Sequence, residues 1–325
     1  MLLFLGVEIG GSKLQIGLGR GDEANFAGFW RSTVEASRGA EPIRERIVVG
    51  VSELLHDAGV RRDEVAGMGI GFGGPVDVAA GTTIISNQVA GWERFPLIAW
   101  ARERFGFPVV IQNDADTAAL AEATFGAGRG FDPLLYLTVG SGIGGGLIVG
   151  GKIFRGNGGG AVEVGHLRPR IGGAPDHSTD LTVEGWSSGF GIEQRTRRIA
   201  AQCGPSDTFD RLLALAGGEP QRITTQLISQ AATAGDPTSL AILNEAIDVL
   251  GWAIGQAVTL INPARVVVGG GVSLIGEELF FAPLRDAVRR WSFRPFTGQA
   301  DVVPAELGEA VVVHGALALA RSEFV

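Results

Sequence analysis

Two stretches of the chain share one pattern: an apolar strand, a tight glycine-rich turn and a second apolar strand. They are residues 3–19 (LFLGVEIGGSKLQIGLG) and residues 134–152 (LLYLTVGSGIGGGLIVGGK). Each turn carries a small hydroxyl residue, Ser12 or Ser141, among glycines that leave backbone N–H groups uncovered. Clustered N–H dipoles bind phosphate without obstruction by side chains. Two such hairpins facing one cleft can hold the β- and γ-phosphates of a nucleotide, so the pattern predicts a two-lobed phosphotransferase.

Strand and helix patterns alternate along the chain, which is typical of α/β layers. With 325 residues, the chain is longer than one hydrophobic core usually serves, so we expect two domains. We predict an N-terminal lobe over residues 1–115 and a larger C-terminal lobe over residues 116–305. The apolar helix over about residues 306–325 is expected to pack back on the first lobe.

The apolar periodicity also places the individual elements. It predicts strands near residues 26–33, 65–71, 108–112, 265–269 and 300–304, and helices over about residues 41–58, 115–123, 189–202, 206–216, 223–233, 238–261, 276–291 and 309–321.

Charge and cysteine content narrow the class of protein. The net charge of −8, without Lys/Arg runs, argues against nucleic acid as a partner. Cys203 stands alone, so no internal disulfide is possible and we expect a reducing cytoplasm. Residues 1–5 lack the basic region of a secretion signal. The uncharged residues 133–151 contain too many glycines for a stable apolar helix, so no membrane segment is expected.

The first turn, over residues 8–13, reads Glu-Ile-Gly-Gly-Ser-Lys. A Gly-Gly pair can supply an ordinary β-hairpin turn. However, an acidic residue at the end of a buried strand is costly without a charged partner, and Mg²⁺ with its waters would be one. The chain has only two lysines, and each lies at one of the two hairpins. We therefore predict that both turns bind the nucleotide: Glu8 near its Mg²⁺, and Gly10, Gly11, Ser12, Lys13, Gly140, Ser141 and Gly142 at the phosphates.

Asn113 and Asp114 lie between a predicted strand and a predicted helix. Either side chain can serve as an N-cap that accepts backbone N–H bonds. Alternatively, a carboxylate at the carboxyl end of a strand, facing an interdomain cleft, is suited to act as a general base. Phosphoryl transfer needs mainly positioning, charge neutralisation and such a base near the acceptor hydroxyl. The residues alone leave both interpretations open.

Further polar residues lie in the second half of the chain. If their loops converge, sugar hydroxyls can be hydrogen-bonded by Glu163, His166 and Glu184. For an isolated Glu, a solvated charge on a loop is the simpler interpretation. Gly269, Gly270 and Gly271 follow a predicted strand, where they let the backbone approach a flat base or ribose, or form only a tight turn.

Taken together, these motifs resemble the ROK family of sugar kinases, in the actin–hexokinase superfamily. The resemblance covers almost the whole chain and rests on VEIGGSK at 7–13, GIGFGGPVD at 69–77, QNDADTAALAEATFGAG at 112–128, TVGSGIGGGLIVGGKIFRGNGGGAVEVGHL at 138–167, VEGWSSG at 183–189 and VVVGGGVS at 266–273. It implies an actin-like (ribonuclease H-like) α/β fold with an interdomain cleft. It also implies a homodimer and the use of ATP with Mg²⁺ held near Glu8.

The resemblance further implies roles for single residues. Asp114 would be the catalytic base, and the sugar would be bound by Gly74, Asn87, Asn113, Glu163, His166 and Glu184.

The chain also departs from the family pattern. Glu8 replaces the usual Asp, and Ser12 and Ser141 replace Thr. Gly73 stands where Pro is usual, and Val162 occupies a customary Gly position. The Glu8 carboxylate should therefore reach about one methylene further toward the metal, and the sugar loop next to Val162 should be shifted.

Family members typically carry a Cys-rich zinc segment, but residues 167–183 of this chain contain no Cys. Asp176, His177 and Asp180 could bind a metal together with His166, although they lack the thiolates that mark structural zinc sites. We predict that zinc is absent.

Three function classes follow from these observations. The first is an ATP-dependent kinase that phosphorylates a hexose hydroxyl. A repressor is disfavoured because the first phosphate hairpin begins within the first few residues, without a helix-turn-helix before it. A sugar-binding protein without catalysis is suggested by Glu8, Val162 and the missing cysteines, whereas Asp114 and the two hairpins argue against it. The sequence leaves the sugar, its hydroxyl and any donor other than ATP open.

Overall fold

A computed structural model of the chain describes residues 2–86, 88–157, 160–169, 181–203 and 209–325. The chain forms two compact units. Unit 1 consists of Met1–Tyr136, Gly146–Ala161 and Ala305–Val325, and unit 2 consists of Leu137–Gly145 and Val162–Pro304. This division differs from the boundary predicted at residue 115. The helix after that residue stays in unit 1 because it packs tightly on the C-terminal helix, which also belongs to unit 1.

Unit 1 is built on a five-stranded sheet with the order β3-β2-β1-β4-β7. Strands β1 and β2 form the first glycine hairpin, and β1, β4 and β7 run parallel. The strands are β1 (Leu3–Ile9), β2 (Lys13–Gly19), β3 (Gly28–Thr33), β4 (Val65–Phe72) and β7 (Val109–Asn113); β5 (Val76–Asp77) and β6 (Thr82–Thr83) form a separate ribbon. The helices are α1 (Ala40–Asp57), α2 (Leu97–Phe105), α3 (Asp114–Thr124) and α10 (Val311–Phe324).

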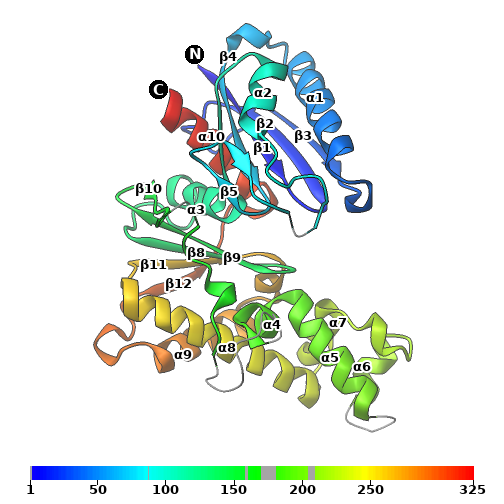
Figure 1. Cartoon of the computed structure of the whole chain (residues 1–325). Helices are drawn as coiled ribbons and strands as arrows, with labels where there is room; N and C mark the ends of the chain where they lie inside the picture. The colour runs from blue at the N-terminus through cyan, green and yellow to red at the C-terminus, as the bar shows by residue number, and fades with distance from the viewer. Residues whose placement is uncertain (1, 87, 158–159, 170–180, 204–208) are drawn as a thin grey trace. The chain divides into compact units, whose positions relative to one another are not determined.

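The two faces of this sheet carry different helices (Figure 1). On one face, alternate residues of β1, namely Leu5, Val7 and Ile9, join a large apolar core with α1 and α2. On the other face, Phe4 packs with Leu317 of α10. Alternation along a strand sends neighbouring residues to opposite faces, so Glu8 lies on the α10 face with Phe4.

Glycines on the α10 face let this helix lie directly on the strand backbone. A Cβ placed on Gly69 of β4 would be 2.0 Å from the carbonyl oxygen of Ala316, and one on Gly6 of β1 would be 2.5 Å from that of Val313. Both distances are far below normal contact. The helix therefore approaches the sheet more closely than any strand residue with a side chain would allow.

A second five-stranded sheet has the order β10-β9-β8-β11-β12. Its strands are β8 (Leu134–Val139), β9 (Ile143–Val149), β10 (Lys152–Ile153), β11 (Arg265–Gly269) and β12 (Asp301–Pro304). The helices of unit 2 are α4 (Val183–Ser187), α5 (Gly189–Cys203), α6 (Asp210–Leu215), α7 (Thr225–Thr233), α8 (Pro237–Ile261) and α9 (Ala282–Trp291).

Most predicted elements form, and the expected α/β class is confirmed. The stretch 133–151 contributes the two strands β8 and β9, and none of the helices that the structure describes is long and apolar enough to cross a membrane. The helix predicted over residues 276–291 is shorter than expected: Glu277–Phe281 form a π-helical turn, and α9 begins only at Ala282. Helices α2 and α4 were not predicted.

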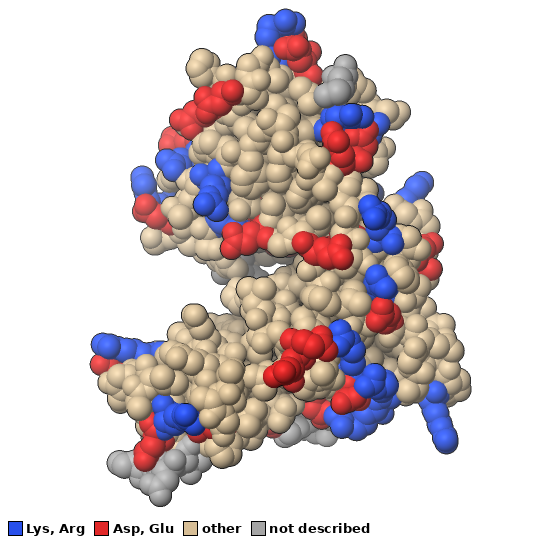
Figure 2. All heavy atoms as spheres, turned by 180° about the vertical axis from the view of Figure 1, so that it is seen from behind, with Lys and Arg blue, Asp and Glu red and all other residues tan. Residues whose placement is uncertain are grey.

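Positive and negative side chains are interspersed on the surface shown in Figure 2. Many of them pair, as Arg285 does with Glu277 and Arg290 with Asp248. Exposed pairs of this kind add little to the stability of a fold. They give each unit a surface of mixed charge.

We expect Gly69→Ala to destabilise the protein by roughly 1–3 kcal/mol, because the new methyl group collides with backbone of α10. Gly160→Ala is the matched control, since a Cβ there would meet no atom within 4 Å. Chemical denaturation of both variants measures the difference. Equal stability of the two variants would contradict the close packing of α10.

Candidate functional site

The turn of the first hairpin is tied down by backbone and side-chain contacts. The Gly10 amide donates to the carbonyl of Lys13 at 3.0 Å. The ammonium group of Lys13 lies 3.1 Å from Oε1 of Glu8 and donates to the carbonyl oxygen of Glu309 at 2.9 Å. The Gln15 amide, oriented to donate, reaches Oε2 of Glu8 at 2.9 Å and the same Glu309 carbonyl at 3.1 Å. The charged partner that Glu8 requires is therefore Lys13 in this structure.

Glu8 is only 5% exposed, and burial raises its pKa to about 7. The nearby ammonium of Lys13 opposes this rise, while the carboxylate of Asp114 adds to it. The carboxylates of Glu8 and Asp114 thus lie close enough to repel each other. The single positive charge of Lys13 can balance only one of their two negative charges. The arrangement favours a further positive charge at this point.

Asn113 caps helix α3. Its Oδ1 accepts from the amides of Ala115 at 2.8 Å and Asp116 at 3.3 Å, and its Nδ2 donates to the carbonyl of Gly74 at 3.1 Å. Of the two interpretations left open for this pair, the structural one holds for Asn113. The same contact ties α3 to the glycine turn after β4, so two predicted sugar-binding residues lie side by side.

Asp114 is the first residue of α3, and its Oδ1 accepts from the Ala115 amide at 2.8 Å. Burial raises the pKa of this carboxyl to about 6, although the helix amides and Lys13 lower it. Its Oδ2 lies 3.5 Å from the position of a Cβ on Gly73. The residue is a carboxylate at neutral pH that takes up a proton more readily than an ordinary Asp.

In unit 2, Glu184 supports the second glycine turn. Its Oε2 accepts from the amide of Ile143 at 2.8 Å, and a Cβ on Gly142 would be 2.6 Å from the same oxygen. The Gly140 amide donates to the carbonyl of Gly142 at 2.9 Å. This carboxylate, predicted to contact sugar, thus lies against the predicted phosphate turn.

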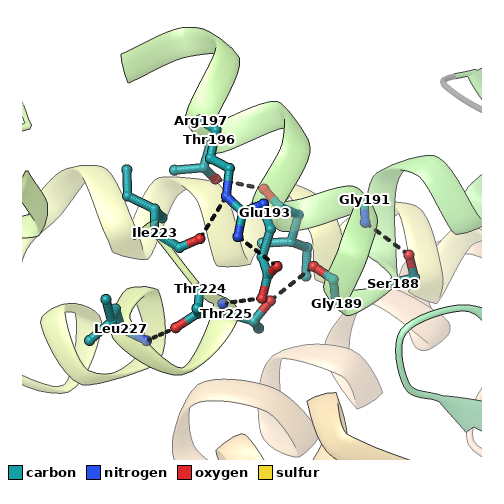
Figure 3. Close-up of polar contacts among 11 residues, drawn as sticks. Ser188, Gly189, Gly191, Glu193, Thr196, Arg197, Ile223, Thr224, Thr225 and Leu227 are labelled. Atoms are coloured by element: carbon teal, nitrogen blue, oxygen red, sulfur yellow. Dashed lines mark hydrogen bonds and ion pairs between the residues drawn. The ribbon is translucent and has the colours of Figure 1, made fainter. Parts of the chain in front are cut away.

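A hydrogen-bond network extends from this turn into the helices behind it. The Gly189 amide, at the start of α5, donates to the carbonyl of Gly140 at 2.8 Å, and the Gly189 carbonyl accepts from the Thr225 hydroxyl at 3.0 Å. Figure 3 shows how Glu193 accepts from the Thr225 amide and from Arg197. The network joins the N-termini of α5 and α7 to the turn.

Glu163 and His166 form a pair at the surface, with 3.8 Å between the carboxylate and Nε2 and more than 60% of each side chain exposed. The preceding residue, Val162, has φ of 63°. A β-branched residue is strained in this conformation, which glycine adopts freely. Val162, which stands where the family usually has Gly, therefore has a strained backbone conformation.

The glycines after β11 approach the end of β8. Gly270 has φ of 88°, and a Cβ there would lie 2.5 Å from the backbone of Val139, directly before the second glycine turn. A Cβ on Gly271 would meet no atom within 4 Å. Gly270 is therefore needed for packing against β8, while Gly271 faces open space.

The structure thus brings the predicted residues of unit 1 together around the first turn. In unit 2, Glu184 lies against the second turn, and the segment of Glu163 and His166 packs beside it, since a Cβ on Gly165 would lie 2.5 Å from the carbonyl oxygen of Ile143. Asn87, Asp176, His177 and Asp180 lie outside the described residues. Among the described residues, no group of three or more His, Cys, Asp or Glu is arranged to hold a metal ion. Sequence reasoning missed the Glu309 carbonyl, which has no residue-type signal, and the side chain of Gln88, which covers Gly11.

Comparison with known proteins places these features in a family. The ROK family model matches residues 4–323. A glucokinase from Streptomyces coelicolor is 33% identical over 330 residues, covering 99% of this chain and 98% of that protein. A xylose repressor from Caldicellulosiruptor bescii is 29% identical over 261 residues, which cover 80% of this chain and 64% of the repressor.

Among solved structures, a ROK family glucokinase from Streptomyces griseus in complex with glucose and AMPPNP aligns with a TM-score of 0.80 and 32% identity, covering 98% of this chain and 99% of that one. This likeness confirms the actin-like ATPase fold expected from the sequence. The family resemblance is confirmed as well: the chain belongs to the ROK family.

Proposed function

We propose that this protein transfers a phosphoryl group from ATP to a hexose hydroxyl, with Asp114 as the general base. The observation that carries the proposal is the position of Asp114 at the N-terminus of α3, with a raised pKa and in electrostatic contact with the Glu8–Lys13 pair. The glucokinase relatives support the reaction class.

Asp114 suits this role for two reasons. A base acts best when its pKa lies near the working pH, and burial moves the pKa of this carboxyl toward that range. The bond from the Ala115 amide fixes Oδ1, so the carboxylate is held in one orientation. Asp114 would accept the proton of the sugar hydroxyl as that oxygen attacks the γ-phosphorus.

The residues around the first turn also fit Mg²⁺ bound with ATP. Glu8 offers oxygen ligands, which Mg²⁺ prefers, and a cation there would relieve the repulsion that the Asp114 carboxylate exerts on Glu8. When bound, the ion would neutralise charge on the β- and γ-phosphates. Lys13 would add a positive charge at the same turn. Because the Gly10 amide already donates to the Lys13 carbonyl, the phosphates would bind the backbone N–H groups of the next residues, Gly11 and Ser12.

The second turn and the glycines after β11 would bind the rest of the nucleotide. A Cβ on Gly140 or Gly271 would meet no atom within 4 Å, so a ligand can come close to these residues, although the Gly140 amide and carbonyl are themselves bonded to Gly142 and Gly189. Glu184 would keep the second turn in shape through Ile143. Glu163 and His166, both exposed, would provide the sugar contacts from unit 2.

The alternative is a ROK protein that binds sugar without catalysis, since the family also contains repressors. Measurement of ADP release with MgATP and a panel of hexoses separates the two. A kinase releases ADP with a subset of the sugars, whereas a sensor binds a sugar and releases none.

We expect Asp114→Asn to lower kcat by roughly two to four orders of magnitude, the usual contribution of a general base. Binding of MgADP should remain, because the Asn side chain can still accept from the Ala115 amide. Steady-state kinetics and calorimetry measure the two effects. Near-wild-type turnover would show that Asp114 is not the base.

The rate should depend on pH through the same carboxyl. The kcat/KM for the sugar should fall about tenfold per pH unit below the pKa of Asp114, which is about 6 in the free protein. The reason is that only the deprotonated carboxyl accepts the proton. A kcat/KM that stays constant from pH 7 to pH 4.5, in a protein that remains folded, would contradict this assignment.

Glu8→Gln should weaken MgATP binding and also stabilise the unliganded protein at high pH. The folded-state pKa of Glu8, about 7, exceeds the ordinary value of 4.5, so folding favours the protonated form. The wild type therefore loses stability as pH rises from about 4.5 to 7, and the neutral Gln avoids this loss. Thermal unfolding should show the Tm advantage of the variant at pH 8 and its disappearance near pH 4. A variant less stable than the wild type at pH 8 would refute the cost assigned to Glu8.

A further inference from the structure

A second carboxylate of helix α3 is completely buried and has no part in the proposed chemistry. Glu122 is 0% exposed, and burial raises the pKa of its carboxyl. Its Oε2 accepts from the Ala127 amide at 2.8 Å, and its Oε1 accepts from the amides of Glu306 and Leu307, both at 3.0 Å. All four residues belong to unit 1.

The segment that Glu122 holds is the turn before α10. Three residues after Glu306, the Glu309 carbonyl accepts from the ammonium of Lys13 at 2.9 Å and from the Gln15 amide at 3.1 Å. The 306–309 turn is therefore bound on one side by Glu122 and on the other by the first phosphate hairpin. Lys13 in turn lies 3.1 Å from Glu8.

We propose that Glu122 is a positioning residue for nucleotide binding, which fixes the 306–309 turn so that the Glu309 carbonyl holds Lys13 beside Glu8. The inference rests on the proposed function, because that function places Lys13 at the phosphates of the nucleotide and Glu8 at its Mg²⁺. Glu122 itself touches neither Lys13 nor substrate; it acts through the backbone of the turn.

The contacts require a carboxylate at this position. Both of its oxygens accept from backbone N–H groups, whereas a Gln amide would turn its NH₂ group toward one of these donors. Buried donors without an acceptor are costly, so the turn would move to find one. Gly126 leaves the necessary space, since a Cβ there would lie 2.1 Å from Oε2 of Glu122.

The test is the Kd of MgADP, measured by calorimetry for wild type, Glu122→Gln, Lys13→Met and the double variant. Supporting residues around a ligand site typically contribute 10- to 100-fold, so Glu122→Gln should raise this Kd by about tenfold. In the Lys13→Met background the same substitution should have almost no further effect, because its action passes through Lys13. Glu306→Gln is the matched control: it changes the same turn but keeps the backbone N–H, and its Kd should equal that of the wild type.

Gly126→Ala provides a second route, since it displaces the carboxylate without changing its charge, and it should weaken MgADP binding in the same way. Thermal unfolding identifies a temperature at which every variant is folded, and binding is measured there. An unchanged Kd in Glu122→Gln, or the same tenfold loss with and without Lys13, would overturn the inference. A wild-type chain that binds a hexose but no MgADP would instead overturn the proposed function, and the inference with it.

Discussion

Helix α10 lies directly on the backbone of β1 and β4, and this contact determines which groups lie beside the first glycine turn. Glycines at positions 6 and 69 remove the side chains that would otherwise hold the helix away from the sheet. The turn that leads into α10 consequently reaches the end of β1, where the Glu309 carbonyl meets Lys13. A helix held further out by side chains could not deliver that carbonyl, and Lys13 would lose one of the two groups that fix it.

The proposed site contains two carboxyl groups in positions where burial disfavours their charged form. Glu8 and Asp114 both have raised pKa values because little water reaches them, and the Asp114 carboxylate raises the pKa of Glu8 further. Val162 adds backbone strain at the edge of the predicted sugar loop. Sites that bind charged ligands commonly carry such costs, which the ligand relieves when it binds. The apolar core around α1 and α2, by contrast, shows the regular alternation of an ordinary sheet.

Much of the fold was predictable because its signals are local. The two hairpins are marked by glycine turns between apolar strands, and α8 begins where expected, with Asp236 accepting from the Ser239 amide. The position of Asp114 at a strand-to-helix junction follows from the same kind of signal. The support of the site was not predictable, since the Leu307 amide that donates to Glu122 lies 185 positions away and a backbone amide has no residue-type signal. For the same reason Glu184 could be named as a polar site residue, but its bond to Ile143 could not be foreseen.

The order of the elements in unit 1 has a consequence for how the chain folds during its synthesis. Strand β1 is made first, yet the helix that covers one of its faces ends only at Phe324. At about 5–20 residues per second, roughly 15 to 60 s pass on the ribosome between the two. During this time the glycine-lined face of β1 and β4, with Phe4 and Glu8 on it, has no α10 to cover it. Helices α1 and α2, made earlier, can already cover the opposite face. The unit therefore completes its core only after α10 has left the ribosome.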